Sequence, residues 1–210
     1  MKKIRQLPLL LLAGLSMSIF SCTFIAKEMM GVRSIKTLDD KKHRRFLRKL
    51  GAPPGNAYSI DTTYLEFIGM RDTQRTDEKK NHYQPIQALY FGQQEFPGAW
   101  FINCYAGGFP NLQWNRGRFF DTFPPTSAAP VDSLVSFTRL FGHAKPLLKG
   151  PLPSVGAGQP YTVVLYWNRF MFRQSRRLHD LVRENLEKSA APYRILYINN
   201  DHLFTGLERE

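Results

Sequence analysis

The sequence predicts a single α/β domain with a mixed sheet of about four strands and flanking helices. The main indication is that two apolar runs, 161–167 and 194–199, flank an amphipathic segment. Two such strands joined by a helix are typical of a parallel pair buried on both faces. The second indication is a pair of apolar runs, 86–91 and 99–105, whose connection contains two glycines and a proline. That pattern favours an antiparallel hairpin.

The first 22 residues have the pattern of a targeting segment. Three basic residues precede an apolar run, 7–20, that is short for a membrane span, and Ser21-Cys22 follows. This arrangement resembles a bacterial lipoprotein signal peptide, in which small residues precede an acceptor cysteine. The resemblance implies cleavage before Cys22 and acylation of that residue. An ordinary secretory signal that ends near a cysteine is the alternative.

Membrane lipid, through acylated Cys22, is therefore the first expected partner. Thr23 rather than an aspartate follows the cysteine, and for such lipoproteins this favours the outer membrane, facing the periplasm of the bacterial cell envelope. The net charge is +12, and removal of residues 1–22 with their three basic residues lowers it to +9. For an exported chain we expect an anionic envelope ligand or protein, and no nucleic acid, as a further partner.

Residues 23–36 are expected to form a tether, and residues 37–210 the domain. A helix is predicted over 37–50, with Thr37 as N-cap and Gly51 after its end. Its many Lys and Arg residues lie close to the anchor, where they could hold the domain on an anionic bilayer. The alternative is a solvated helix whose last-turn cations favour its dipole.

The other predicted elements are short. Asp61-Thr62 is an N-cap pattern that predicts a second helix. Residues 71–81 are charged and are predicted to form a solvent-exposed loop. A short helix is predicted over 130–142, followed by a linker, 144–160, that is rich in Pro and Gly.

The helix between the two apolar strands has an apolar stripe at helical spacing, formed by Met171, Leu178, Leu181, Val182 and Leu186. Its many arginines are predicted to form a solvated face, with an anion-binding face as the alternative. Pro192 prevents the helix from continuing into the second strand.

The segment Tyr166–Gln174 resembles the first strand-to-helix turn of thioredoxin-like proteins. Those proteins carry an aromatic pair and then Trp-Cys-x-x-Cys, and Met171 and Gln174 occupy the cysteine positions here. Because a thioether and an amide cannot supply a thiolate, dithiol exchange at this turn is excluded. A strand–strand–helix unit precedes the strand–helix–strand unit, so the resemblance implies a permuted thioredoxin-like core.

A second resemblance covers most of the mature chain. The strings NHYQPIQALYF, FINCYAGGFPNLQWN and VVLYWNRFM are similar to those of a family of small uncharacterised bacterial lipoproteins. This resemblance implies export and lipid anchoring and implies no activity.

The most unusual composition lies in residues 106–125, where aromatic residues alternate with amides, arginines and glycines. Rings that stack and amides that orient a polar ligand suit a concave binding surface. With the turn after the first apolar strand, this loop gives the predicted ligand-binding residues Trp114, Asn115, Arg116, Arg118, Asn168 and Arg169. The alternative is a loop packed by its own aromatic residues.

Catalytic and metal chemistry have few candidates. Cys104 is the only cysteine besides Cys22, and a packing role inside the second hairpin strand is expected for it. A thiol enzyme that uses Cys104 with His82 or His143 as base is the alternative function. Asp121 has no second carboxylate nearby in sequence, and the five histidines have no metal-ligand spacing. A non-catalytic binding or scaffolding module without a metal or cofactor is therefore the main prediction.

Overall fold

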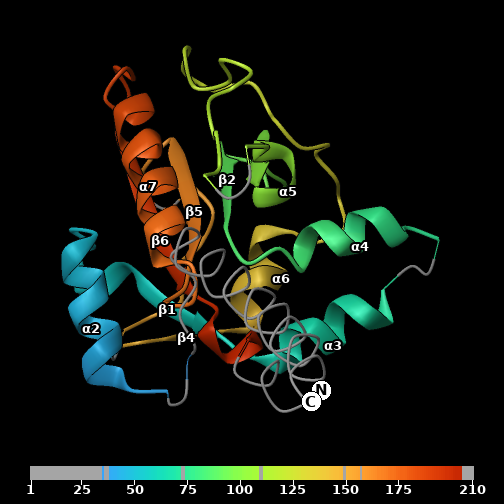
Figure 1. Ribbon diagram of the computed structural model, residues 1–210, viewed down its shortest axis with the longest axis vertical. Coiled ribbons are helices and arrows are strands. Elements are labelled where there is room, and N and C mark those ends of the chain that lie inside the picture. The colour runs from blue at the N-terminus through green and yellow to red at the C-terminus, as the bar shows by residue number, and fades with distance from the viewer. Residues whose placement is uncertain are drawn as a thin grey trace, which may run out of the picture.

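The computed structural model shows one central sheet with helices on both faces (Figure 1). It describes residues 35, 38–71, 74–108, 111–148, 150–156 and 158–204. The predicted signal peptide, with Cys22, and the predicted tether apart from Ile35 lie outside these residues. Within the part of the chain that is described, no helix has the length and apolar character needed to cross a bilayer.

The sheet has six strands in the order β3-β2-β5-β6-β1-β4, so the prediction of about four strands was too low. The pairs β5–β6 and β6–β1 are parallel, and the other neighbouring pairs are antiparallel. The mixed α/β class is therefore confirmed. The strands are β1 (Ala57–Ile60), β2 (Gln87–Phe91), β3 (Ala99–Ile102), β4 (Ala144–Pro146), β5 (Tyr161–Trp167) and β6 (Tyr193–Asn199).

The two strands missing from the prediction, β1 and β4, are the shortest elements of their half of the sheet. β1 pairs with β6 on one side and with β4 on the other, with Ser59 opposite both Asn199 and Lys145. Strands of three or four residues carry too little alternation to be recognised from sequence. The predicted linker 144–160 therefore begins with a strand.

The strand–helix–strand prediction is confirmed in detail. β5 and β6 are parallel along their full length, from Tyr161 opposite Tyr193 to Trp167 opposite Asn199. The predicted hairpin is also confirmed, with Leu89 of β2 opposite Trp100 of β3. The second hairpin strand ends at Ile102 rather than at residue 105, because residues 103–106 form the short helix α5 (Asn103–Ala106).

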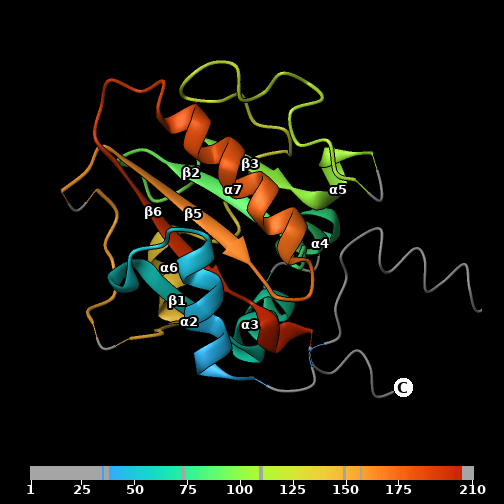
Figure 2. The same cartoon turned by 60° about the vertical axis from the view of Figure 1, so that its left-hand side comes forward.

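One face of the sheet is covered by α2 (Asp40–Lys49) and α7 (Phe172–Leu186) (Figure 2). Leu178, Val182 and Leu186 of α7 are fully buried, which confirms the predicted stripe. α2 packs against the start of α7 through an edge-to-face contact between the rings of Phe46 and Phe172, 4.4 Å between centroids. The N-cap of α2 is Asp39, and the predicted cap, Thr37, lies outside the described residues.

The opposite face is covered by α3 (Thr62–Met70) and α6 (Phe137–Gly142). Asp61 caps α3 as the sequence predicts. The predicted helix over 130–142 is confirmed only for its last six residues.

The prediction of a loop over 71–81 was wrong over most of its length, because the helix α4 (Thr76–His82) lies there. α4 has acidic residues in its first turn and basic residues in its last. Two single-turn 3-10 helices complete the fold, η1 (Pro54–Asn56) and η2 (Asp201–Leu203).

Candidate functional site

The carboxyl ends of the parallel strands β5 and β6 meet at one end of the sheet, where α/β proteins commonly bind ligands. Asn168 and Arg169 follow β5 there, and Asn200 and Asp201 follow β6. His43 of α2 reaches the same place. These five residues, which we call the carboxyl-end cluster, are all buried.

The charged part of this cluster is centred on Asp201, which is fully buried. Its Oδ1 accepts a hydrogen bond from the Arg169 backbone N–H at 2.7 Å, and its Oδ2 accepts one from Arg169 Nε at 2.7 Å. His43 Nε2 lies 3.0 Å from the same Oδ2. Burial alone would raise the pKa of Asp201, but the bonds from His43 and Arg169 outweigh it and hold that pKa below its ordinary value. The group is therefore a carboxylate at neutral pH.

The amide part of the cluster connects three segments. Asn168 Nδ2 donates to the carbonyl of Pro85, just before β2, at 2.9 Å and to Asn200 Oδ1 at 3.2 Å. Asn168 Oδ1 accepts a bond from the backbone N–H of Met171 at 2.6 Å, where the chain turns into α7. Asn200 Nδ2 also donates to the Pro85 carbonyl, at 2.9 Å. Asn168 and Arg169, the two predicted ligand-binding residues of this turn, thus use these polar atoms to bind neighbouring groups of the protein.

The described residues of the loop 106–125, namely 106–108 and 111–125, pack against α7. Trp114 is buried in the core on this face, and Asn115 accepts a bond from the Phe120 N–H at 3.0 Å. Asn185 of α7 donates to the carbonyls of Phe120 and Thr122 at 2.9 and 2.6 Å. Lys188 donates to the Phe120 carbonyl at 2.8 Å. These hydrogen bonds attach the described part of the loop to α7 and to Lys188, which follows it.

The two arginines of the loop are exposed. Arg118 Nε lies 2.6 Å from Asp121 Oδ2, in an ion pair at the surface. Arg116 lies beside Gly107, where a Cβ atom would come within 3.3 Å of its guanidinium. The six predicted ligand-binding residues are thus divided between buried structural positions and an exposed loop surface.

Cys104 is exposed at the start of α5, so the prediction that it is buried inside a strand was wrong. Partial desolvation raises the pKa of its thiol, which disfavours the thiolate. Both candidate bases have other partners. His82 lies 3.2 Å from Asp132 and 3.2 Å from the Tyr64 hydroxyl, and His143 stacks on Phe67 at 4.6 Å. Among the described residues, these contacts offer the thiol no activating base.

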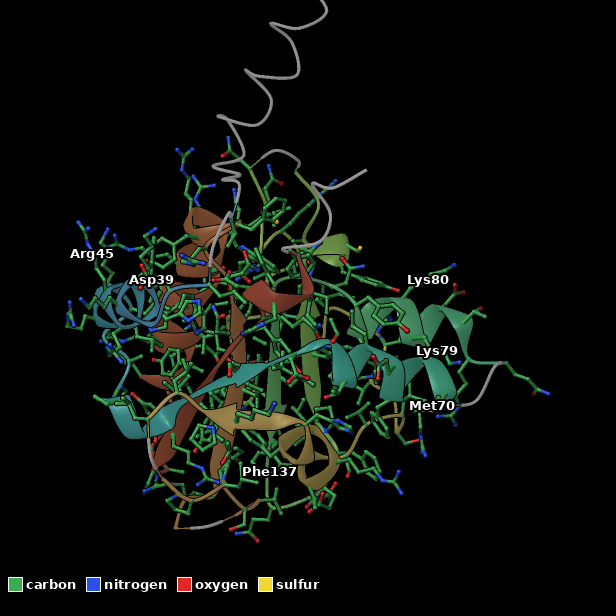
Figure 3. The ribbon with its side chains drawn as sticks, turned by 90° about the horizontal axis from the view of Figure 1, so that it is seen from below. Asp39, Arg45, Met70, Lys79, Lys80 and Phe137 are labelled. Carbon is green, nitrogen blue, oxygen red and sulfur yellow. The ribbon has the colours of Figure 1, made fainter. Side chains whose placement is uncertain are left out.

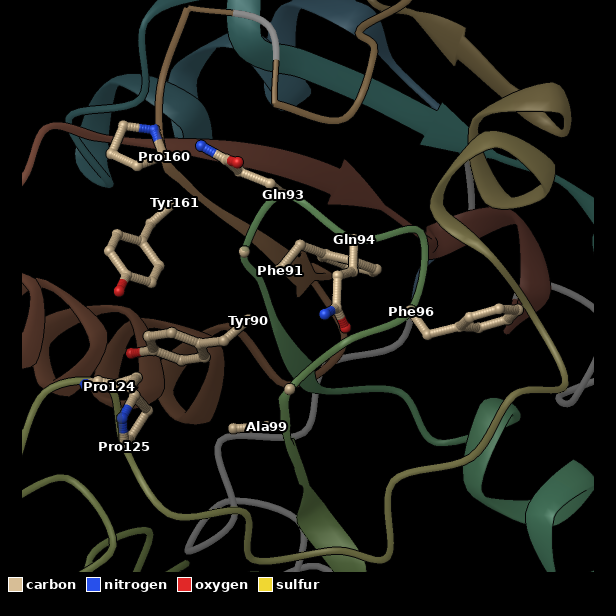
Figure 4. A pocket seen from close by; sticks show the side chains of 12 residues that line it. Tyr90, Phe91, Gln93, Gln94, Phe96, Ala99, Pro124, Pro125, Pro160 and Tyr161 are labelled. Atoms are coloured by element: carbon tan, nitrogen blue, oxygen red, sulfur yellow. The ribbon is translucent and has the colours of Figure 1, made fainter.

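The opposite end of β5 borders a cavity of about 470 Å³, to which none of the six predicted residues contributes. It lies between the β2–β3 connection, the prolines at 124 and 125, and Tyr161 at the start of β5 (Figure 4). The six residue steps of β5 place it roughly 20 Å from the carboxyl-end cluster. Composition did not reveal this cavity because its residues come from three separate segments.

Among the described residues, no three His, Cys, Asp or Glu side chains are grouped to hold a metal ion.

Comparison with protein-family models, curated proteins and solved structures gives no significant match.

Proposed function

We propose that the protein is a lipid-anchored component of the bacterial cell envelope, attached through acylated Cys22 to the outer membrane and facing the periplasm. Its α/β domain acts there as a non-catalytic binding or scaffolding module. The basic start, the apolar run and Cys22 support the anchor. Acyl chains contribute about 0.8 kcal/mol for each buried methylene, so several chains on one residue give firm attachment.

The observation that carries the proposal is the surface of α2. Six basic residues of this ten-residue helix are exposed, while His43, Leu47 and Leu50 face the core. The exposed set is Lys41, Lys42, Arg44, Arg45, Arg48 and Lys49. α2 begins eighteen positions after Cys22, so an extended chain would place it at most roughly 60 Å from the anchor. Each Lys or Arg near an anionic bilayer contributes about 1 kcal/mol.

The non-catalytic role is supported by how the carboxyl-end cluster is built. The turn that carries the cysteines in thioredoxin-like proteins has Met171 and Gln174 here, and its polar residues hold neighbouring strands together. We propose that the core is a permuted thioredoxin-like arrangement. The antiparallel hairpin that precedes β5 in the chain and pairs with it through β2 supports this relationship.

Replacement of Cys22 by serine is expected to abolish acylation, because serine cannot form the thioether. Labelling cells with a palmitate analogue should mark the natural protein and leave Cys22→Ser unlabelled, with accumulation of the uncleaved precursor. Cys104→Ser is the matched control, since Cys104 is the only other cysteine. Labelling that survives Cys22→Ser would refute lipid anchoring at this residue.

Charge reversal on α2 is expected to weaken contact with anionic lipid. The mature chain, secreted without its acyl chains, should sediment with vesicles that contain phosphatidylglycerol and not with phosphatidylcholine alone. Arg44→Glu with Arg45→Glu should reduce this binding by about tenfold or more, since each lost cation is worth about 1 kcal/mol.

The matched control reverses Lys79 and Lys80 on α4. Figure 3 shows these residues on the opposite side of the molecule from Arg45, and the change in net charge is the same. The control should bind the anionic vesicles nearly as well as the natural chain. Equal losses in both variants would mean that net charge, rather than the α2 face, determines binding.

A further inference from the structure

The first half of α7 is rich in arginine and contains no acidic residue before Asp180. Arg173, Arg176 and Arg177 lie there with their side chains exposed. Arg176 Nε and Asp180 Oδ2 are 3.8 Å apart, in a surface ion pair that contributes little to stability. In the second half of the helix and just after it, acidic and basic residues occur together. The positive charge of α7 is therefore concentrated in its first half.

Helix stability does not explain this position. The amino-terminal end of a helix is the positive end of its dipole, where an anion is favourable and a cation is unfavourable. Arg173 lies in the first turn of α7, and that turn has no acidic residue. In α2, by contrast, basic residues lie in the last turn, where the dipole favours them. The arginines at the start of α7 therefore indicate a role outside the helix itself.

Two further basic segments flank α7. α2, whose exposed basic residues are named above, packs against the start of α7 through Phe46 and Phe172. Five residues after Phe172, on another side of the helix, Arg177 Nη1 donates a hydrogen bond to Asn111 Oδ1 at 3.1 Å. The loop that contains Asn111 also carries the exposed Arg116. All three segments pack on one face of the sheet (Figure 2). Their exposed cations form one surface, which we call the basic face.

Among the described residues, the other face of the sheet has no comparable excess of positive charge. Lys145 Nζ lies 2.8 Å from Asp61 Oδ2, and on α4, beside α3, Lys80 Nζ lies 3.1 Å from Asp77 Oδ1. Glu66 is exposed on α3 as well. Because the chain as a whole is strongly basic and this face is closer to balance, the charge of the domain is polarised across the sheet. The field of a charged surface orients a molecule that is polarised in this way.

We propose that the basic face, with α7 as well as α2, lies against the anionic headgroups of the bilayer that holds the acyl anchor. The sheet then lies roughly parallel to the membrane, and α3 and α6 face the aqueous side. Phosphate headgroups suit this face because a guanidinium can donate two parallel hydrogen bonds to a phosphate. A bilayer is favoured over an acidic protein because the face spans three segments and the anchor keeps it near lipid. The inference rests on the proposed lipid anchor and adds the orientation of the domain.

The test uses the full acylated chain in phosphatidylcholine vesicles with or without phosphatidylglycerol, in which some headgroups carry a nitroxide quencher. A fluorophore is attached at Asp180→Cys on α7 or at Glu66→Cys on α3, each combined with Cys104→Ser. Both positions are exposed, and both changes remove one negative charge. We expect strong quenching at position 180 only when phosphatidylglycerol is present, with recovery in about 1 M salt, where screening is strong. The fluorophore at position 66 should stay unquenched.

Arg176→Gln with Arg177→Gln should shift the equilibrium between docked and undocked states about tenfold toward the undocked state, because two cations leave the contact. Quenching at position 180 then falls, although α2 is unchanged. The matched control is Lys80→Gln with Arg139→Gln, since both residues are exposed outside the basic face and the loss of charge is the same. The control should leave quenching unchanged.

Three results would overturn the proposal. They are a fluorophore at position 180 that stays unquenched with phosphatidylglycerol, equal quenching at positions 180 and 66, and equal loss of quenching in the two double variants. The first would leave an acidic protein as the partner of the basic face, and the last would show a response to net charge alone. The same fluorophores can be read on the mature chain without acyl chains, added to the same vesicles. Failure of the lipid anchor is therefore distinguishable from failure of this docking.

Discussion

Replacement of Asp201 by alanine is expected to lower the free energy of unfolding by about 3–5 kcal/mol, because it removes the buried carboxylate that Arg169 and His43 both contact. The carboxylate is fully buried, and Arg169 is only 7% exposed. Both oxygens are used, one by the Arg169 backbone and the other by its guanidinium and by His43. Urea unfolding followed by circular dichroism measures the loss.

The same carboxylate gives a pH dependence whose sign follows from its lowered pKa. A carboxyl group that is more acidic in the folded state stabilises the fold above its unfolded pKa, and this contribution is lost as pH falls. The stability difference between the natural chain and Asp201→Asn should therefore be largest near neutral pH and shrink below about pH 4. Asp77→Asn is the matched control, because Asp77 is 92% exposed and its ion pair with Lys80 is worth little. A difference that grows on acidification would contradict this account.

The half of the fold that the sequence predicts correctly is the half with the strongest periodic pattern. β5, α7 and β6 combine two largely apolar strands of seven residues with a fifteen-residue amphipathic helix. The hairpin is equally clear because Gly92, Pro97 and Gly98 separate two apolar runs. In these segments the local preference and the tertiary environment agree, so the pattern is sufficient.

The remaining elements depend on contacts that a local pattern does not contain. β4 is a strand because Ser59 and its neighbours in β1 supply hydrogen-bond partners, and its own three residues, Ala-Lys-Pro, indicate no strand. α4 was predicted as a loop because its sequence is almost entirely polar. Yet His82 at its end is buried against Trp100, with 4.6 Å between ring centroids. That contact anchors a helix whose outer residues remain in solvent.

The role of the predicted ligand-binding residues also depends on contacts that a local sequence pattern does not contain. Trp114 and Asn115 belong to residue types that serve ligand binding and loop packing equally well. In the structure, Asn185 of α7 ties this loop to the core. The cavity residue Tyr90 was hidden inside an apolar strand, where its type signals packing. Only the structure places this residue beside the cavity, so no sequence signal could have identified it.

The second large effect is expected at Asn168. It distinguishes a structural role from a ligand-binding role for the turn after β5. Its side chain makes three hydrogen bonds, to the Pro85 carbonyl, to Asn200 and from the Met171 N–H, and it is fully buried. Asn168→Ala removes all three and leaves buried backbone and amide groups without partners. We expect a loss of about 3 kcal/mol, at roughly 1 kcal/mol for each bond. Chemical denaturation at neutral pH measures it.

Asn111→Ala is the matched control, because within the described part of the chain that exposed amide accepts one side-chain hydrogen bond, from Arg177 at 3.1 Å. Its cost should stay below about 1 kcal/mol. Asn168→Asp should not rescue stability, since a carboxylate cannot donate to the Pro85 carbonyl and would be buried near Asp201. A ligand-binding asparagine would behave in the opposite way, because its loss would leave stability unchanged or improved. An Asn168→Ala variant as stable as the natural chain would therefore contradict a structural role for Asn168 and favour a ligand-binding role for this turn.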